Sequence, residues 1–213
     1  MQRFGGCARV CRRFLALAVL GLGACAPTRY YTLAVRAPLR REAAPGVPVS
    51  VADVILPPGL NQLALTSFRS GTHVRVSRRA RWVRSPEKLC REVLAEDLAQ
   101  RLSETVVVLP GQRAPTPLRT LHVVIDRFVP SGSDTVVLRA HWFVSGSLAG
   151  PVGSADGTAR IVLTGALTTL TEAHVMSEAL AHLASQISVR LARASQSGIP
   201  PLKPLDVPRD TVF

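Results

Sequence analysis

Histidine side chains are the first groups in this sequence that could bind a metal or act as a base. The sequence has five of them, His73, His122, His141, His174 and His182. His174 and His182 lie on one predicted helix but about 80° apart around it, which is poor geometry for sharing a metal ion. His122 and His141 can face each other across paired strands, where a cross-strand polar pair is the favoured interpretation. The histidines therefore predict no metal site.

Nucleophiles and acids do not combine into a catalytic motif either. The segment Val144-Ser145-Gly146-Ser147 lacks the spacing of a Gly-x-Ser-x-Gly elbow, and no glycine-rich phosphate loop follows a predicted strand. Asp126, Asp134 and Asp156 fall at predicted strand ends or turns, a usual structural position for aspartate. We expect a protein that is not an enzyme, with no catalytic residue, metal or cofactor.

One cysteine stands where it can be acylated. Leu22-Gly23-Ala24-Cys25 resembles the bacterial lipobox, in which an apolar residue and two small residues precede a cysteine that receives acyl chains. Ahead of it, the apolar run over residues 14–22 is too short for the roughly 20 residues of a membrane-spanning helix. Four arginines precede that run, as in an export signal, namely Arg3, Arg9, Arg12 and Arg13. We expect residues 1–24 to be removed and Cys25 to carry acyl chains such as palmitate.

The residues around this motif also bear on sorting and on disulfides. By resemblance to known lipoproteins, Ala26 rather than an aspartate after the cysteine implies sorting to the cell outer membrane, on its periplasmic face. The alternative is a soluble secreted protein cut by the ordinary signal peptidase, with Cys25 unmodified. Cys7 and Cys11 would leave with the signal, so Cys90 remains as a single thiol that cannot form an internal disulfide.

Basic residues concentrate in one stretch of the mature chain. Removing the four signal arginines lowers the formal charge from +12 to +8. Between Arg69 and Arg91, eight basic residues accompany one acid, Glu87. A basic surface attracts acidic proteins, anionic lipid headgroups or nucleic acid, and the expected compartment excludes nucleic acid.

Regular alternation in this stretch would place Arg75, Ser77, Arg79 and Arg81 on one face of a strand. We take Arg75, Arg79, Arg81 and the adjacent Trp82 as candidate contacts for a protein partner or for lipid headgroups. The alternatives are a solvated arginine-rich surface and, for Trp82, a packing position in the core or the hairpin.

Alternating apolar residues and turn signals predict a series of short strands. They cover residues 30–35, 49–56, 63–69, 73–77, 105–109, 120–129, 135–145 and 158–167. Ser85-Pro86-Glu87 begins a predicted helix that runs to about Leu102, and a second helix is predicted over residues 171–193. The strands over 63–77 form a predicted hairpin, and the last three form a predicted antiparallel meander.

These elements predict an α+β fold of two layers, with two amphipathic helices packed on one face of a largely antiparallel sheet. The expected segments are a lipoprotein signal peptide (1–24), a tether (25–29), a folded domain (30–194) and a proline-rich disordered tail (195–213).

Several short segments of the sequence occur in the same order as the matching segments of one known family. They are Tyr31-x-Leu33, residues 49–57 ending in Pro57, Leu63-Ala64-Leu65 with Trp82 and Leu89, Ile125-Asp126-Arg127-Phe128, Val137-Leu138-Arg139-Ala140-x-Trp142 and the final helix. In this order and spacing the sequence resembles the ABC-type transport auxiliary lipoprotein family, also called the PqiC-like group. The resemblance covers most of the mature chain.

The resemblance implies a non-enzymatic, outer-membrane-anchored subunit of an envelope lipid transport system. Such a subunit docks a periplasmic MCE-type substrate-binding protein that works with an inner-membrane ABC transporter or related membrane protein, and a homo-oligomer is left open. The alternative is a lipopolysaccharide-assembly lipoprotein that partners an outer-membrane β-barrel. A tethered hydrolase is a remote third hypothesis.

Overall fold

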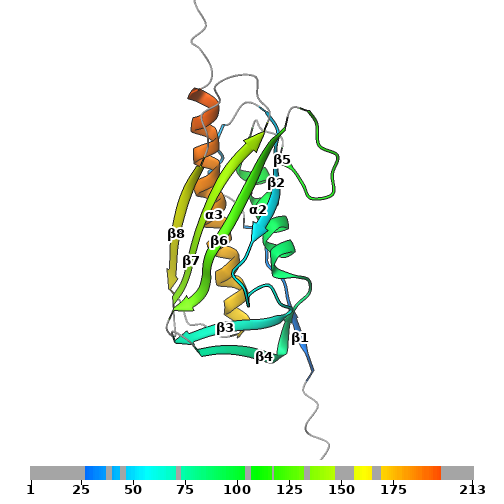
Figure 1. Ribbon diagram of the computed structural model, residues 1–213, viewed down its shortest axis with the longest axis vertical. Helices are drawn as coiled ribbons and strands as arrows, with labels where there is room; N and C mark the ends of the chain where they lie inside the picture. The colour runs from blue at the N-terminus through cyan, green and yellow to red at the C-terminus, as the bar shows by residue number, and fades with distance from the viewer. Residues whose placement is uncertain are drawn as a thin grey trace, which may run out of the picture.

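Two helices and two β-sheets make up the fold in the computed structural model (Figure 1). It describes residues 27–36, 40–43, 47–70, 73–103, 107–116, 118–131, 135–146, 156–164 and 169–197. The predicted signal peptide, Cys25 and the residues after Ser197 lie outside these ranges. Among the helices so described, none is both long and apolar enough to cross a membrane. The α+β class predicted from the sequence is confirmed.

The larger sheet has five strands in the order β5-β2-β6-β7-β8. They are β2 (Val49–Ile55), β5 (Val107–Val108), β6 (Arg119–Ser131), β7 (Thr135–Gly146) and β8 (Asp156–Thr164). The predicted antiparallel meander of β6, β7 and β8 is confirmed. In contrast, β2 pairs in parallel with both β5 and β6, so the sheet is mixed.

The smaller sheet has three strands in the order β1-β4-β3. They are β1 (Arg29–Tyr31), β3 (Ala64–Ser70) and β4 (His73–Trp82). The predicted hairpin of β3 and β4 is confirmed, and β1 adds to it in parallel with β4. Figure 1 shows this sheet at the end of the molecule opposite the C-terminus of the last helix, α3 (Thr169–Ser197).

Both helices cover the same face of the five-stranded sheet, and Figure 1 looks onto the opposite, uncovered face. The first helix, α2 (Pro86–Arg101), begins as predicted, because the Ser85 hydroxyl accepts a hydrogen bond from the Lys88 amide and proline takes the first position. The core between the helices and the sheet contains fully buried residues from each layer, including Leu94, Leu183, Ile187 and Leu121. Packing of the apolar helix faces explains the two-layer arrangement.

The segment that follows β1 is held by side chains of both helices. The Ala34 amide donates to the Ser177 hydroxyl at 3.1 Å, and the Arg36 amide donates to Asp97 Oδ1 at 2.9 Å. Residues 32–36 therefore do not continue the strand predicted over 30–35, since the amides of Ala34 and Arg36 donate to helix side chains. Farther along, the Glu42 amide donates to the carbonyl of Arg101 at 2.6 Å. The entry into the domain is thus fixed to the helical layer.

Candidate functional site

His122 and His141 lie on the uncovered face of the five-stranded sheet, each with its own partners. His122 Nε2 is 3.1 Å from the Ser145 hydroxyl, and its ring stacks on Phe143 with centroids 4.7 Å apart. His141 Nδ1 is 3.1 Å from Asp126 Oδ2. Within the described ranges, no three histidine, cysteine or acidic side chains come together to hold a metal ion. The two histidines act as surface polar residues of a sheet.

The basic strand β4 departs from regular alternation. Ala64 pairs with Arg81 and Thr66 pairs with Val76, so two steps along β3 match five along β4. The bulge is closed by Ser77, whose hydroxyl accepts from the amide of Ala80 at 2.9 Å. An odd number of additional residues reverses the side on which the following residues lie.

The predicted row of arginines along β4 is therefore wrong. The register places Arg75 and Arg81 on opposite sides of the hairpin, with Arg79 in the bulge between them. All three are exposed, as a partner or headgroup contact requires. Trp82 is only 4% exposed and belongs to the hydrophobic core, which agrees with the packing interpretation and removes it from the contact surface.

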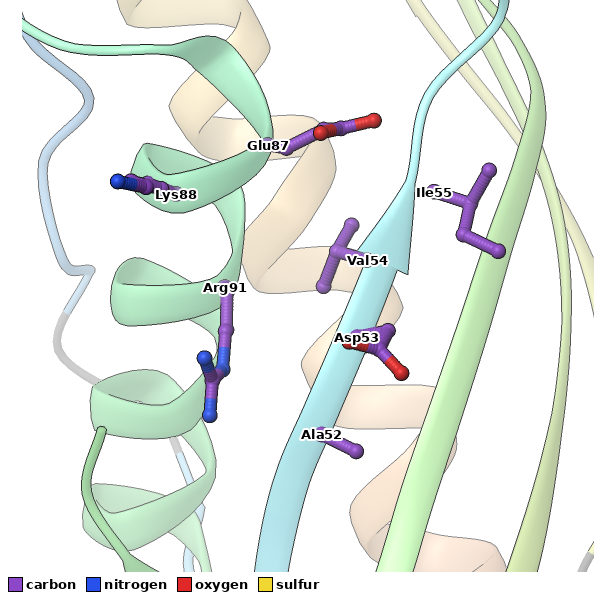
Figure 2. A pocket seen from close by; sticks show the side chains of 7 residues that line it. All are labelled: Ala52, Asp53, Val54, Ile55, Glu87, Lys88 and Arg91. Carbon is purple, nitrogen blue, oxygen red and sulfur yellow. The ribbon is translucent and has the colours of Figure 1, made fainter. Parts of the chain in front are cut away.

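A small groove lies between α2 and β2 (Figure 2). It measures about 210 Å³ and is lined by Ala52, Asp53, Val54, Ile55, Glu87, Lys88 and Arg91. Figure 2 shows Lys88 turned away from β2, and Arg91 Nε donates a hydrogen bond to the carbonyl of Val51 at 2.9 Å. The volume is below the roughly 300–1,000 Å³ of small-molecule sites, so the groove cannot enclose the acyl chains of a lipid.

A cross-strand row of arginines on the uncovered sheet face was missed in the sequence. Arg127 of β6 pairs with Arg139 of β7, which pairs in turn with Arg160 of β8. All three side chains are exposed, and none forms an ion pair with an acid in the described part of the chain. Like charges directly opposite each other destabilise a sheet. Because none of the three arginines has an acidic ion-pair partner among the described residues, the row is a candidate for pairing with an anionic ligand or partner.

The rows to either side give this face a mixed character. Phe143 and Ile55 lie on one side of the arginine row and Val162 lies on the other, and the three are 48%, 52% and 45% exposed. Aromatic residues and arginines are enriched in protein interfaces. The uncovered face of the sheet thus combines apolar contact area with a fixed row of positive charge.

Asp97 of α2 is a second residue that the sequence reasoning did not single out. It is fully buried, and burial raises the pKa of its carboxyl, against the opposing effects of the Arg36 amide and the nearby Arg101 charge. An acid within the apolar stripe of a helix was the available signal, since Asp97 follows Val93 and Leu94 by four and three residues. Because its Oδ1 binds the Arg36 amide, Asp97 anchors the entry segment and does not point into an accessible site.

Comparisons with known proteins agree with this fold. A crystal structure of an uncharacterized protein superposes with a TM-score of 0.64 at 16% identity, covering 78% of this chain and 99% of the other. A crystal structure of a Xanthomonas campestris protein of the DUF330 family gives a TM-score of 0.61 at 12% identity, with 80% and 98% coverage. At these identities the likeness shows the fold alone.

The sequence comparisons go further. Among curated proteins, none matches the chain. The family described as ABC-type transport auxiliary lipoprotein component matches residues 31–188, which extend from the end of β1 into the second half of α3. This is the family that the order of sequence motifs resembled. The chain therefore belongs to the family of ABC-type transport auxiliary lipoprotein components.

Proposed function

We propose that the chain is an outer-membrane-anchored subunit of an envelope lipid transport system, tethered through acyl chains on Cys25. In this proposal it docks a periplasmic MCE-type substrate-binding protein, which works with an ABC transporter or related membrane protein. The observation that carries the proposal is the family match over residues 31–188. Two or more acyl chains make a stable anchor, whereas one chain binds membranes only marginally.

The geometry supports a docking role over a carrier role. The groove between α2 and β2 is too small for lipid chains, and the centre of the domain is filled by packed side chains of helices and sheet. By contrast, one whole face of the five-stranded sheet is uncovered (Figure 1). A subunit of this shape can hold a partner in place without enclosing the cargo.

We place the docking surface on that uncovered face, around Arg127, Arg139 and Arg160. Guanidinium groups form charge-assisted and often bidentate hydrogen bonds with carboxylates, which are stronger than neutral ones. In the part of the chain that the structure describes, the row forms no ion pair with an acid, so an acidic surface on the MCE-type protein would supply the opposite charge. The exposed Val162, two residues after Arg160, provides apolar contact beside the row, and Phe143 adds apolar contact farther along β7.

Co-purification of the lipidated protein with the MCE-type protein tests this surface. Arg139→Glu places an acid in the centre of the row and should reduce capture of the partner at least tenfold, while Arg113→Glu, an equal charge change on the exposed loop before β6, should leave it unchanged. Capture by the unmodified protein should fall between low and high salt, because exposed charges are screened beyond about 10 Å at 0.1 M. Equal capture by both variants would exclude the arginine row as the docking surface. Purification with an outer-membrane β-barrel in place of the MCE-type protein would favour the lipopolysaccharide-assembly alternative.

A further inference from the structure

The outer side of the three-stranded sheet carries exposed apolar residues. Tyr30 pairs with Arg81, which pairs with Ala64, so these residues share the side that faces away from the buried Trp82. Tyr30 is 65% exposed. This exposure leaves most of a large, partly apolar aromatic ring open to solvent.

Two exposed valines lie next to these residues. Val76 pairs with Thr66, two residues from Ala64, and Val83 directly follows Trp82, the last residue of β4. They are 50% and 49% exposed. Tyr30, Val76 and Val83 together with Arg81 form what we call the tip surface. It lies at the end of the molecule opposite the C-terminus of α3 (Figure 1).

The proposed anchor lies close to the tip surface along the chain. Cys25 precedes Arg29, the first residue of β1, by four residues. Four residues of fully extended chain span at most about 14 Å. Any acyl chains on Cys25 therefore hold Arg29, at the start of β1 in the three-stranded sheet, within about 14 Å of the lipid headgroups.

The chemistry of the tip surface matches that of a headgroup layer. Tyrosine is enriched at membrane–water interfaces, where its ring meets the acyl boundary and its hydroxyl meets water. Arginine pairs with lipid phosphates, and Arg78 and Arg79 in the β4 bulge add exposed positive charge beside Arg81. A protein partner with an acidic surface would pair with the arginines but would not account for the position of the tip next to the tether.

We infer that the tip surface rests on the anionic headgroups of the membrane that holds the anchor, and so sets the orientation of the domain. This inference rests on the proposed acylation of Cys25. With the tip on the membrane, the long axis of the molecule points away from the bilayer, and the uncovered face of the five-stranded sheet lies along its side. That orientation leaves the proposed docking surface accessible to a partner in the periplasm.

Fluorophore labelling can test the inference in the mature lipidated protein. Cys90 is fully buried and burial raises its pKa to about 12, so it does not compete with an introduced surface thiol. Val76→Cys on the tip and Val162→Cys on the five-stranded sheet form a matched pair of half-exposed valines in strands. Each is labelled with an environment-sensitive fluorophore and reconstituted in vesicles of phosphatidylethanolamine and phosphatidylglycerol that contain a headgroup-level quencher lipid.

Quenching is expected at position 76 and not at position 162. Arg81→Glu in the Val76→Cys background changes the charge of the tip surface by two units. Each unit should lower the ratio of membrane-contacting to free orientations about fivefold, so the ratio should fall about 25-fold in total. Vesicles of phosphatidylcholine alone should give weaker quenching at position 76. Flotation of the protein with the vesicles is measured in each sample, to show that the anchor is in place.

The controls separate failure of the inference from failure of the anchor. Flotation without quenching at position 76 would overturn the inference, as would quenching that is equal at the two positions. If quenching at position 76 is lost when the MCE-type protein binds, the tip surface would be assigned to a protein partner. Protein that neither floats nor carries fatty acid would instead overturn the proposed acylation of Cys25.

Discussion

Glu172 in the first turn of α3 should make the stability of the domain depend on pH. Its side chain is 7% exposed, and burial raises the pKa of its carboxyl from 4.5 to about 7. The helix N-terminus favours the ionised form by about 0.3–1 kcal/mol. Raising a pKa from 4.5 to about 7 corresponds to about 3 kcal/mol, so desolvation dominates.

The sign follows from the number of protons that each state binds. Below pH 4.5 both states are protonated, and the carboxyl carries no penalty for burial of charge. Between pH 4.5 and 7 the folded state keeps a proton that the unfolded state has released, so stability falls as pH rises. Above pH 7 both states are ionised, and the full cost of about 3 kcal/mol is present.

Glu172→Gln removes this cost and should stabilise the domain at pH 8.5 by up to about 3 kcal/mol, or about 6–12 °C in melting temperature. At pH 5 the gain in stability should be under about 1 kcal/mol, because the Glu172 carboxyl of the folded state is still protonated and the cost of burying its charge is largely absent. Urea denaturation across this pH range measures both values, with Glu96→Gln on the exposed side of α2 as the control. A gain that is the same at pH 5 and pH 8.5 would refute the assignment of a buried carboxyl to Glu172.

Three further changes test the anchor and the packing. Cys25→Ser should abolish uptake of labelled fatty acid and leave unprocessed precursor, and label on the variant would contradict the lipobox interpretation. Leu183→Ala removes a fully buried side chain and should cost about 2–5 kcal/mol, measured by urea denaturation, whereas a loss under 1 kcal/mol would show that the helix interface is loosely packed. Truncation after Ser197 should leave the melting temperature unchanged, but truncation after Ala194 should lower it. The shorter chain lacks the buried Ser195 hydroxyl, which accepts a hydrogen bond from Arg119 Nη1 at 3.3 Å. Equal melting temperatures of the two truncated chains would show that this contact adds no stability.

Local signals in the sequence were sufficient for the helices and the hairpin. Ser85 and Pro86 specify the start of α2 by chemistry that acts within one turn, and alternation specifies the strands of the meander. The arrangement of the strands in two sheets could not be predicted from such local signals. It depends on β1 pairing with β4 and on β2 pairing with β6, and both contacts join segments that are far apart in the chain.

The candidate surfaces show the same limit. Alternation placed Arg75 and Arg81 on one face, but the bulge closed by the Ser77 hydroxyl reversed the register, and nothing in the residue types marks a bulge of that length. The row of Arg127, Arg139 and Arg160 exists only because three strands align at those residues. Register is set by packing of the opposite, buried face, so a single sequence does not reveal it.

The proposed docking of an MCE-type protein on the uncovered sheet face is tested most directly by site-specific photo-cross-linking in living cells. A photoreactive amino acid replaces Thr158, which is exposed on β8 beside the arginine row, or Gln100, which is exposed on α2 in the helical layer. Cross-linked products are identified by mass spectrometry. A cross-link from position 158 to the MCE-type protein, with none from position 100, is the predicted result. Cross-links to that protein from position 100 alone, or from position 158 to a β-barrel protein, would contradict it.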